Sequence, residues 1–148
     1  MKHPLATYVA VVIAASMACA GSAFALTKEE HKAAKEKIEA DYKADRKNCD
    51  AMKDNAKDVC NAEAKGKQKV AKAELDASMK PGPAADEKVK KAKADAQYEV
   101  AKEKCDDLKD KAKDTCQKDA KAAQKVAHEE ARMTRDTAKK AAAPEKKS

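Results

Sequence analysis

Five cysteines are the residues of this 148-residue chain whose type and spacing could support chemistry. Four of them form two pairs with the same interval, Cys49/Cys60 and Cys105/Cys116. Cysteines can be redox-active, can bind a metal as thiolates or can form structural disulfides. A redox catalyst favours C-x-x-C at a helix start, which is absent, and a zinc site needs ligands that converge on one ion. We therefore expect structural disulfides, with a metal or redox buffer as the lower alternative.

Other catalytic patterns are not found in the sequence. Beyond the first 25 residues the only serines are Ser78 and Ser148, and glycine is too scarce for a phosphate-binding loop. His31 and His128 are expected on different faces, which does not suggest a metal site. The acidic residues are interspersed with lysines, as on a solvated helix surface. The sequence predicts a non-enzymatic protein with no catalytic, cofactor-binding or metal-binding residues.

The first 25 residues have the pattern of a secretory signal peptide. A short basic start precedes an uncharged apolar run, and Ala23-Phe24-Ala25 supplies a small-x-small site before Leu26. Cleavage between Ala25 and Leu26 removes Cys19 and leaves an even number of cysteines, as an oxidising compartment favours. Lipoprotein processing at Cys19 is the competing interpretation. We expect a periplasmic protein with no transmembrane span after cleavage.

The remaining chain is predicted to be all-α, because alanine, lysine and acidic residues dominate it. Thr27-Lys28-Glu29-Glu30 has the form of a capping box, and Pro81-Gly82-Pro83 must interrupt a helix. We expect helix one over about 28–80, a turn at 81–83 and helix two over about 84–140. Together, residues 26–140 would form a long, coiled-coil-like antiparallel hairpin. Residues 141–148 would form a disordered basic tail.

The cysteine pairing follows from this predicted hairpin. Eleven residues of α-helix rise about 16.5 Å, whereas a disulfide needs Cα atoms within about 7 Å, so a bridge within one unbroken helix is excluded. The two pairs are symmetric about the Pro-Gly-Pro turn. The sequence therefore predicts two interhelical disulfides, Cys49–Cys116 and Cys60–Cys105.

An internal repeat relates the two halves of the chain. A shift of 56 residues aligns Tyr42 with Tyr98, both cysteine pairs, and the Gln68-Lys69-Val70-Ala71 segment with its counterpart. We interpret this repeat as the duplication of one helix. Gly66 has Ala122 as its counterpart and is expected to weaken or kink helix one.

Charge is distributed unevenly along the chain. The formal net charge is +7, and residues 132–148 hold +4 of it. Such a basic end could bind an anionic envelope surface, whereas the lack of stacking aromatic residues disfavours nucleic acid. The partner we expect is an unknown envelope protein or an anionic envelope surface.

Runs such as Lys109-Asp110-Lys111-Ala112-Lys113-Asp114 resemble the helical stalk of the TolA cell-envelope protein and of small exported proteobacterial proteins of that composition. This resemblance implies an envelope-associated structural or interaction module. The cysteine spacing is also similar to that of the disulfide-stapled hairpins of twin-cysteine mitochondrial proteins. Lys113 to Lys121 resembles late-embryogenesis-abundant helices, which implies stress protection as the alternative function.

Overall fold

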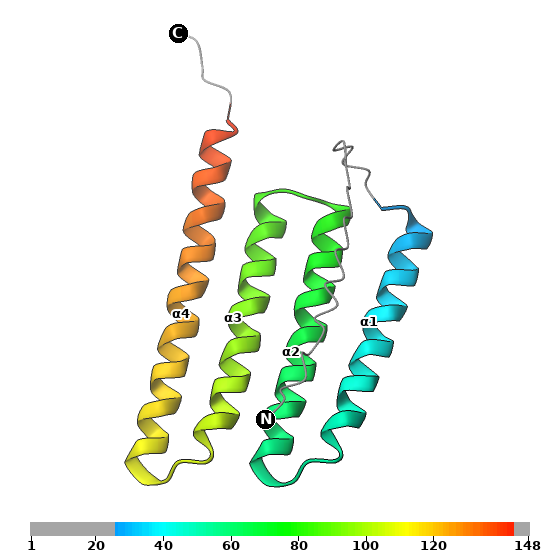
Figure 1. Ribbon diagram of the computed structural model, residues 1–148. Coiled ribbons are helices and arrows are strands. Elements are labelled where there is room, and N and C mark those ends of the chain that lie inside the picture. Colours follow the sequence, from blue (N-terminus) through cyan, green and yellow to red (C-terminus); the bar gives the residue numbers. More distant parts are fainter. Residues whose placement is uncertain (1–25, 144–148) are drawn as a thin grey trace, which may run out of the picture.

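The computed structural model describes residues 26–143, which form four helices and no strands (Figure 1). Their order is α1 (Lys28–Cys49), α2 (Asp54–Met79), α3 (Pro83–Cys105) and α4 (Asp110–Ala141). The predicted all-α hairpin class is confirmed. The predicted boundaries need a correction, because helix one is two helices, α1 and α2, and helix two is α3 and α4.

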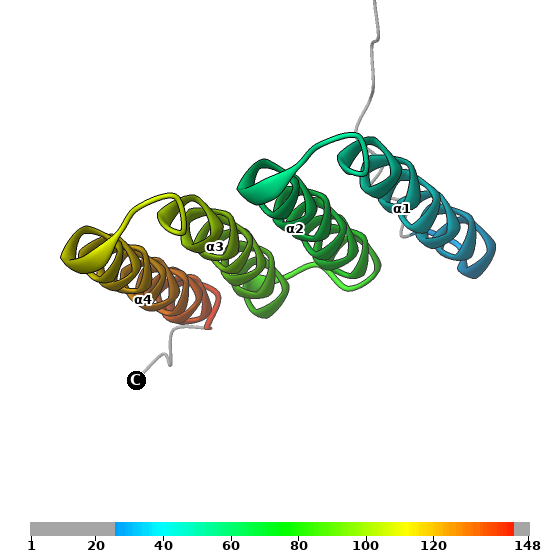
Figure 2. The same ribbon diagram turned by 90° about the horizontal axis from the view of Figure 1, so that it is seen from below.

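The four helices lie side by side in a single row (Figures 1 and 2). Among the described residues, α1 contacts only α2, α2 also contacts α3, and α3 also contacts α4. The row does not close into a bundle, so few side chains are buried. The buried apolar residues are Cys49, Ala64, Ala94, Cys105 and Ala131. A single layer leaves both of its sides open to solvent or to another layer.

Local sequence explains the first helix start and the central turn. Thr27 and Glu30 form the predicted capping box, with the Glu30 amide donating to the Thr27 hydroxyl at 3.2 Å and the Thr27 amide donating to the Glu30 carboxylate at 2.8 Å. Pro83 occupies the first turn of α3, where an amide hydrogen is not needed. Gly82 precedes it at φ 145°, a conformation that side chains disfavour. The chain therefore reverses direction between α2 and α3, as predicted.

Two further reversals, at residues 50–53 and 106–109, lie at the ends of the helices opposite the central turn (Figure 1). Neither contains glycine or proline. The left-handed backbone is instead adopted by Asp54 and Asp110, both at φ 50°. Aspartate is one of the few residues with a side chain that tolerates this region. The repeated unit is therefore a helical hairpin, α1–α2 or α3–α4, and our interpretation as a duplicated single helix is wrong.

Gly66 does not break its helix, because α2 continues from Asp54 to Met79. It is buried where α2 meets α3, and a Cβ added there would lie 2.9 Å from the Cβ of Ala96. Real Cβ contacts are longer than this. The glycine thus permits close approach of the two hairpins.

The predicted signal peptide, residues 1–25, lies outside the described residues, as does most of the predicted tail (144–148). Cys19 and Ala25 therefore lie outside them, while Leu26 is half-buried just before the cap of α1. The last helix ends at Ala141, close to the predicted end. Within residues 26–143, none of the helices is long and apolar enough to span a membrane.

Candidate interaction surface

Both disulfides close hairpins. Cys49 is bonded to Cys60 with a Cα–Cα distance of 5.6 Å, and Cys105 to Cys116 with 5.7 Å. Each bridge joins two helices, as expected, but the predicted pairs Cys49–Cys116 and Cys60–Cys105 are wrong. A rise of about 16.5 Å separates the cysteines of each pair only if the helix between them is unbroken. The chain turns between them, so eleven residues return it to the same level.

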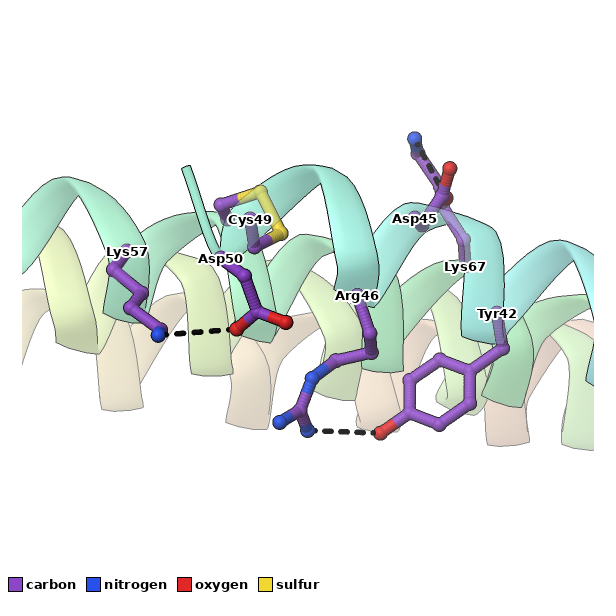
Figure 3. The surroundings of a disulfide bond; sticks show 8 residues. Tyr42, Asp45, Arg46, Cys49, Asp50, Lys57 and Lys67 are labelled. Atoms are coloured by element: carbon purple, nitrogen blue, oxygen red, sulfur yellow. Dashed lines mark hydrogen bonds and ion pairs between the residues drawn. A yellow bond between two sulfur atoms is a disulfide. The ribbon is translucent and has the colours of Figure 1, made fainter. Parts of the chain in front are cut away.

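Each disulfide is accompanied by an ion pair at the turn. The Lys57 ammonium lies 3.0 Å from the Asp50 carboxylate, and Lys113 lies 3.2 Å from Asp106. The second pair is the first shifted by 56 residues. Figure 3 shows Asp50 and Lys57 on the same side of the row as Tyr42 and Arg46, whose guanidinium donates to the Tyr42 hydroxyl at 3.2 Å. We call this the polar side.

Hydrogen bonds continue across both hairpins on the polar side. Gln68 and Lys72 of α2 both contact the Glu39 carboxylate of α1, with Gln68 at 2.8 Å. At the same positions of the second hairpin, Gln124 and His128 of α4 contact Asp95 of α3, with His128 at 2.8 Å. On the polar side, equivalent networks of side-chain hydrogen bonds and ion pairs therefore connect the two helices of each hairpin.

Ion pairs also perturb two carboxylates. Lys72 lowers the pKa of Glu39 below its ordinary value, with a smaller contribution from Gln68. At the other end of the row, Glu87 is 7 % exposed and receives Lys91 at 2.6 Å and Arg135 at 2.6 Å. Lys91 first, and then Arg135, lowers the pKa of Glu87 against the opposing effect of burial. Arg135 thereby ties α4 to the start of α3.

The opposite side of the row differs between the two hairpins. In the first, Asp45 and Lys67 form an ion pair at 3.2 Å that lies across α1 and α2, away from the Tyr42–Arg46 pair (Figure 3). The residues 56 positions later are Ala101 and Ala123. Without the ion pair, a hollow of about 780 Å³ lies open between α3 and α4. Its lining is mainly small and includes Ala101, Ala112, Cys116, Ala120 and Ala123.

A second groove of about 690 Å³ runs between α2 and α3 and shares Ala101 with the first. Its lining is largely apolar and includes Gly66, Val70, Ala71, Ala96, Val100 and Ala101 beside the polar Gln97. Its rim is charged: α2 contributes the acids Glu63 and Glu74 and the base Lys67, whereas α3 contributes the bases Lys93 and Lys104. We call the side that holds both hollows the grooved side. It is the candidate interaction surface.

The grooved side has the features of a binding surface more than those of an active site. All four described cysteines are bonded to one another, so they present no thiolate in this state. Within residues 26–143, no cluster of His, Cys, Asp or Glu has the geometry to hold a metal ion. Two apolar hollows with a charged rim are instead suited to taking up a second layer of structure.

The grooved side was not predicted from the sequence. The available signal was the divergence between the repeats, where Asp45 and Lys67 give way to Ala101 and Ala123. Two charges lost at positions that face each other across a hairpin indicate an altered surface. Recognising that they face each other requires the pairing of α3 with α4, which the single-hairpin prediction did not contain.

In comparisons with known proteins, no protein family, curated protein or solved structure matches this chain.

Proposed function

We propose that this chain is a non-enzymatic periplasmic protein that serves as a structural or interaction module of the cell envelope. The observation that carries the proposal is the two-sidedness of the helical row. The polar side carries networks of side-chain hydrogen bonds, whereas the grooved side exposes two apolar hollows with a charged rim. Such a surface is typical of proteins that bind another protein.

The compartment in this proposal rests on the disulfides and the leader pattern. Disulfides persist in the periplasm and are reduced in the bacterial cytosol. Each bridge closes a hairpin whose buried apolar surface is small, so an oxidising compartment supports the fold directly. The compositional resemblance to the TolA stalk supports the same envelope location.

Export is tested by fractionating cells that produce the full chain and measuring the intact mass of the product. We expect a periplasmic product that begins at Leu26, carries no lipid and contains two disulfides. A reduced, full-length chain in the cytosol would contradict the proposal. A lipid-modified Cys19 would keep the envelope role but move the protein to a membrane leaflet.

The envelope role is tested by deleting the gene in the producing bacterium and measuring sensitivity to detergent. We expect the deletion to raise sensitivity and the wild-type chain to restore it. A variant with all four cysteines of the two bridges changed to serine should restore less, because its hairpins are no longer locked. A deletion strain with an unchanged envelope would contradict the role.

The same chain also separates this proposal from stress protection. A locked module should be helical in dilute buffer, as measured by circular dichroism at 222 nm. A protectant that folds on drying should gain its helicity only on dehydration. Thiol titration distinguishes the redox or metal buffer, for which free thiols would be found in the periplasmic product.

A further inference from the structure

The grooved side has a shape and a charge pattern that fit a second copy of the same side. We propose that two copies of this chain dock with their grooved sides together and with their helices antiparallel, α2 over α3 of the second copy. The proposal rests on the interaction role above and names the partner. Its first support is that a single layer lacks the second layer that helical domains normally have.

Charge sets the orientation of the two layers. Both acids of the α2–α3 groove, Glu63 and Glu74, line its α2 wall together with Lys67, whereas the charged residues of its α3 wall, Lys93 and Lys104, are both basic. If the two-fold axis runs parallel to the helices, each α2 wall faces an α3 wall, and acids meet bases. If the axis runs perpendicular to the layers, the grooved sides do not face each other at all. If it runs across the helices, in the plane between the layers, each α2 wall faces an α2 wall, and acids meet acids.

Rotation about an axis parallel to the helices exchanges the two walls of the groove, so each α2 wall faces an α3 wall and acids meet bases. Rotation about an axis that runs across the helices, between the layers, keeps each wall in place, so α2 faces α2 and acids meet acids. Complementarity therefore selects the axis parallel to the helices. Because α2 and α3 run in opposite directions, the facing helices are antiparallel, as proposed.

Shape supports the same arrangement. With α2 over α3 of the second copy, the first hairpin of one chain covers the second hairpin of the other. The first hairpin carries the Asp45–Lys67 ion pair across its helices, and Lys67 is 71 % exposed. The second hairpin has its hollow at the equivalent position. The lysine stem can enter this hollow while its ammonium approaches Asp119 at the rim.

Addition of a second copy at the edge of the row is disfavoured. The outer edge of α4 corresponds to the edge of α2 that receives α3. There, Ala122 replaces Gly66, and a Cβ at the glycine position would lie 2.9 Å from the facing alanine Cβ. Lys118 and Glu129 also replace Ala62 and Ala73. A polar outer edge is what ends an array of repeats.

The primary measurement is sedimentation velocity of the purified, oxidised chain from about 1 to 100 μM, the range of moderate protein affinities. We expect a monomer–dimer equilibrium within this range. A single monomeric species at the highest concentration would overturn the proposal. So would larger species that grow continuously with concentration, because a two-fold interface closes at the dimer.

The first variant copies the ion pair of the first hairpin into the second. A101D/A123K places at α3 and α4 the residues that the chain already accommodates at Asp45 and Lys67. It should keep the helical signal and weaken the dimer by about tenfold or more, because it fills the hollow. The matched control, A40D/A44K, makes the same residue changes on the exposed outer edge of α1 and should leave dimerisation unchanged. Equal dimerisation of the two variants would refute the site.

The second test uses trans-complementation. E63K and K104E should each weaken self-association, because like charges then meet across the interface. Mixed together, the two variants should dimerise again, because the lysine introduced in one chain faces the glutamate introduced in the other. The control mixture, E36K with K47E, carries the same charges on the outer edge of α1. Equal pairing in both mixtures would show non-specific attraction and would overturn the orientation.

These measurements use the purified chain alone. A monomer in solution would therefore reject the second copy as the occupant of the grooved side, while the detergent-sensitivity assay would still decide the envelope role independently.

Discussion

Replacing Gly66 by alanine tests how the two hairpins are held together. No disulfide joins α2 to α3 in the described structure, so their packing and the short turn between them connect the hairpins. In an exposed helix, a glycine-to-alanine change stabilises by about 1 kcal/mol through backbone entropy. At Gly66 the new Cβ would lie 2.9 Å from the Ala96 Cβ and 3.4 Å from its Cα. Overpacking of this kind costs about 1–3 kcal/mol.

The two effects oppose each other, so the single variant should range from neutral to about 2 kcal/mol less stable. A double-mutant cycle separates them. A96G alone should cost about 1 kcal/mol in helix propensity, whereas G66A/A96G should approach the wild-type stability because the Cβ has moved from one helix to the other. The expected coupling between the two sites is about 1–3 kcal/mol.

The assay is urea unfolding of the oxidised chain followed by circular dichroism at 222 nm. The control is A122G, at the equivalent exposed position of α4, which should simply cost about 1 kcal/mol. If G66A stabilises by about 1 kcal/mol and its effect adds to that of A96G, the close approach of α2 and α3 is wrong.

Three further predictions concern the bridges, their pairing and the charge network. Non-reducing digestion should yield peptides that join Cys49 to Cys60 and Cys105 to Cys116, and a dominant peptide joining Cys49 to Cys116 would restore the single long hairpin. Removing both cysteines of either bridge should lower the free energy of unfolding in urea by about 3 kcal/mol, because each closes a loop of similar length; an unchanged value would mean that the hairpins are held by packing alone. Because the folded pKa of Glu87 lies below its ordinary value of 4.5, its ionisation stabilises the fold above that pH, and this stabilisation is lost as pH falls through the folded pKa. The chain should therefore lose more stability between pH 7 and pH 3 than its E87Q variant does, as measured by urea unfolding at both pH values, and equal losses would remove Glu87 from the acid response.

The sequence was informative wherever a local signal determines the backbone. The capping box at Thr27 and the turn at Pro81 lie where they were predicted, because each depends on hydrogen bonds or steric limits within a few residues. Helical composition and the 56-residue repeat were also visible directly. These features were sufficient for the all-α class and for the position of the central turn.

The reversals after Cys49 and Cys105 were missed because they carry no glycine or proline. Their left-handed residues are Asp54 and Asp110, and aspartate is common throughout this chain, so one aspartate gives little contrast. Without those turns, helix rise excluded the bridges that form. A stronger signal was the repeat itself, which contains a complete cysteine pair in each unit and so is consistent with a self-contained, disulfide-closed hairpin.

The position of the two bridges also determines how the chain would respond to a pulling force. Each disulfide carries the load between its two cysteines, so tension applied at the chain ends does not extend the residues between them. The tension instead separates α2 from α3. With a separation of 11 residues at each bridge and Cα–Cα distances of 5.6 and 5.7 Å, an oxidised chain stretches about 65 Å less than a reduced one. Under tension the oxidised chain would therefore be shorter and stiffer than the reduced chain, and it would yield first at the contact between the two hairpins.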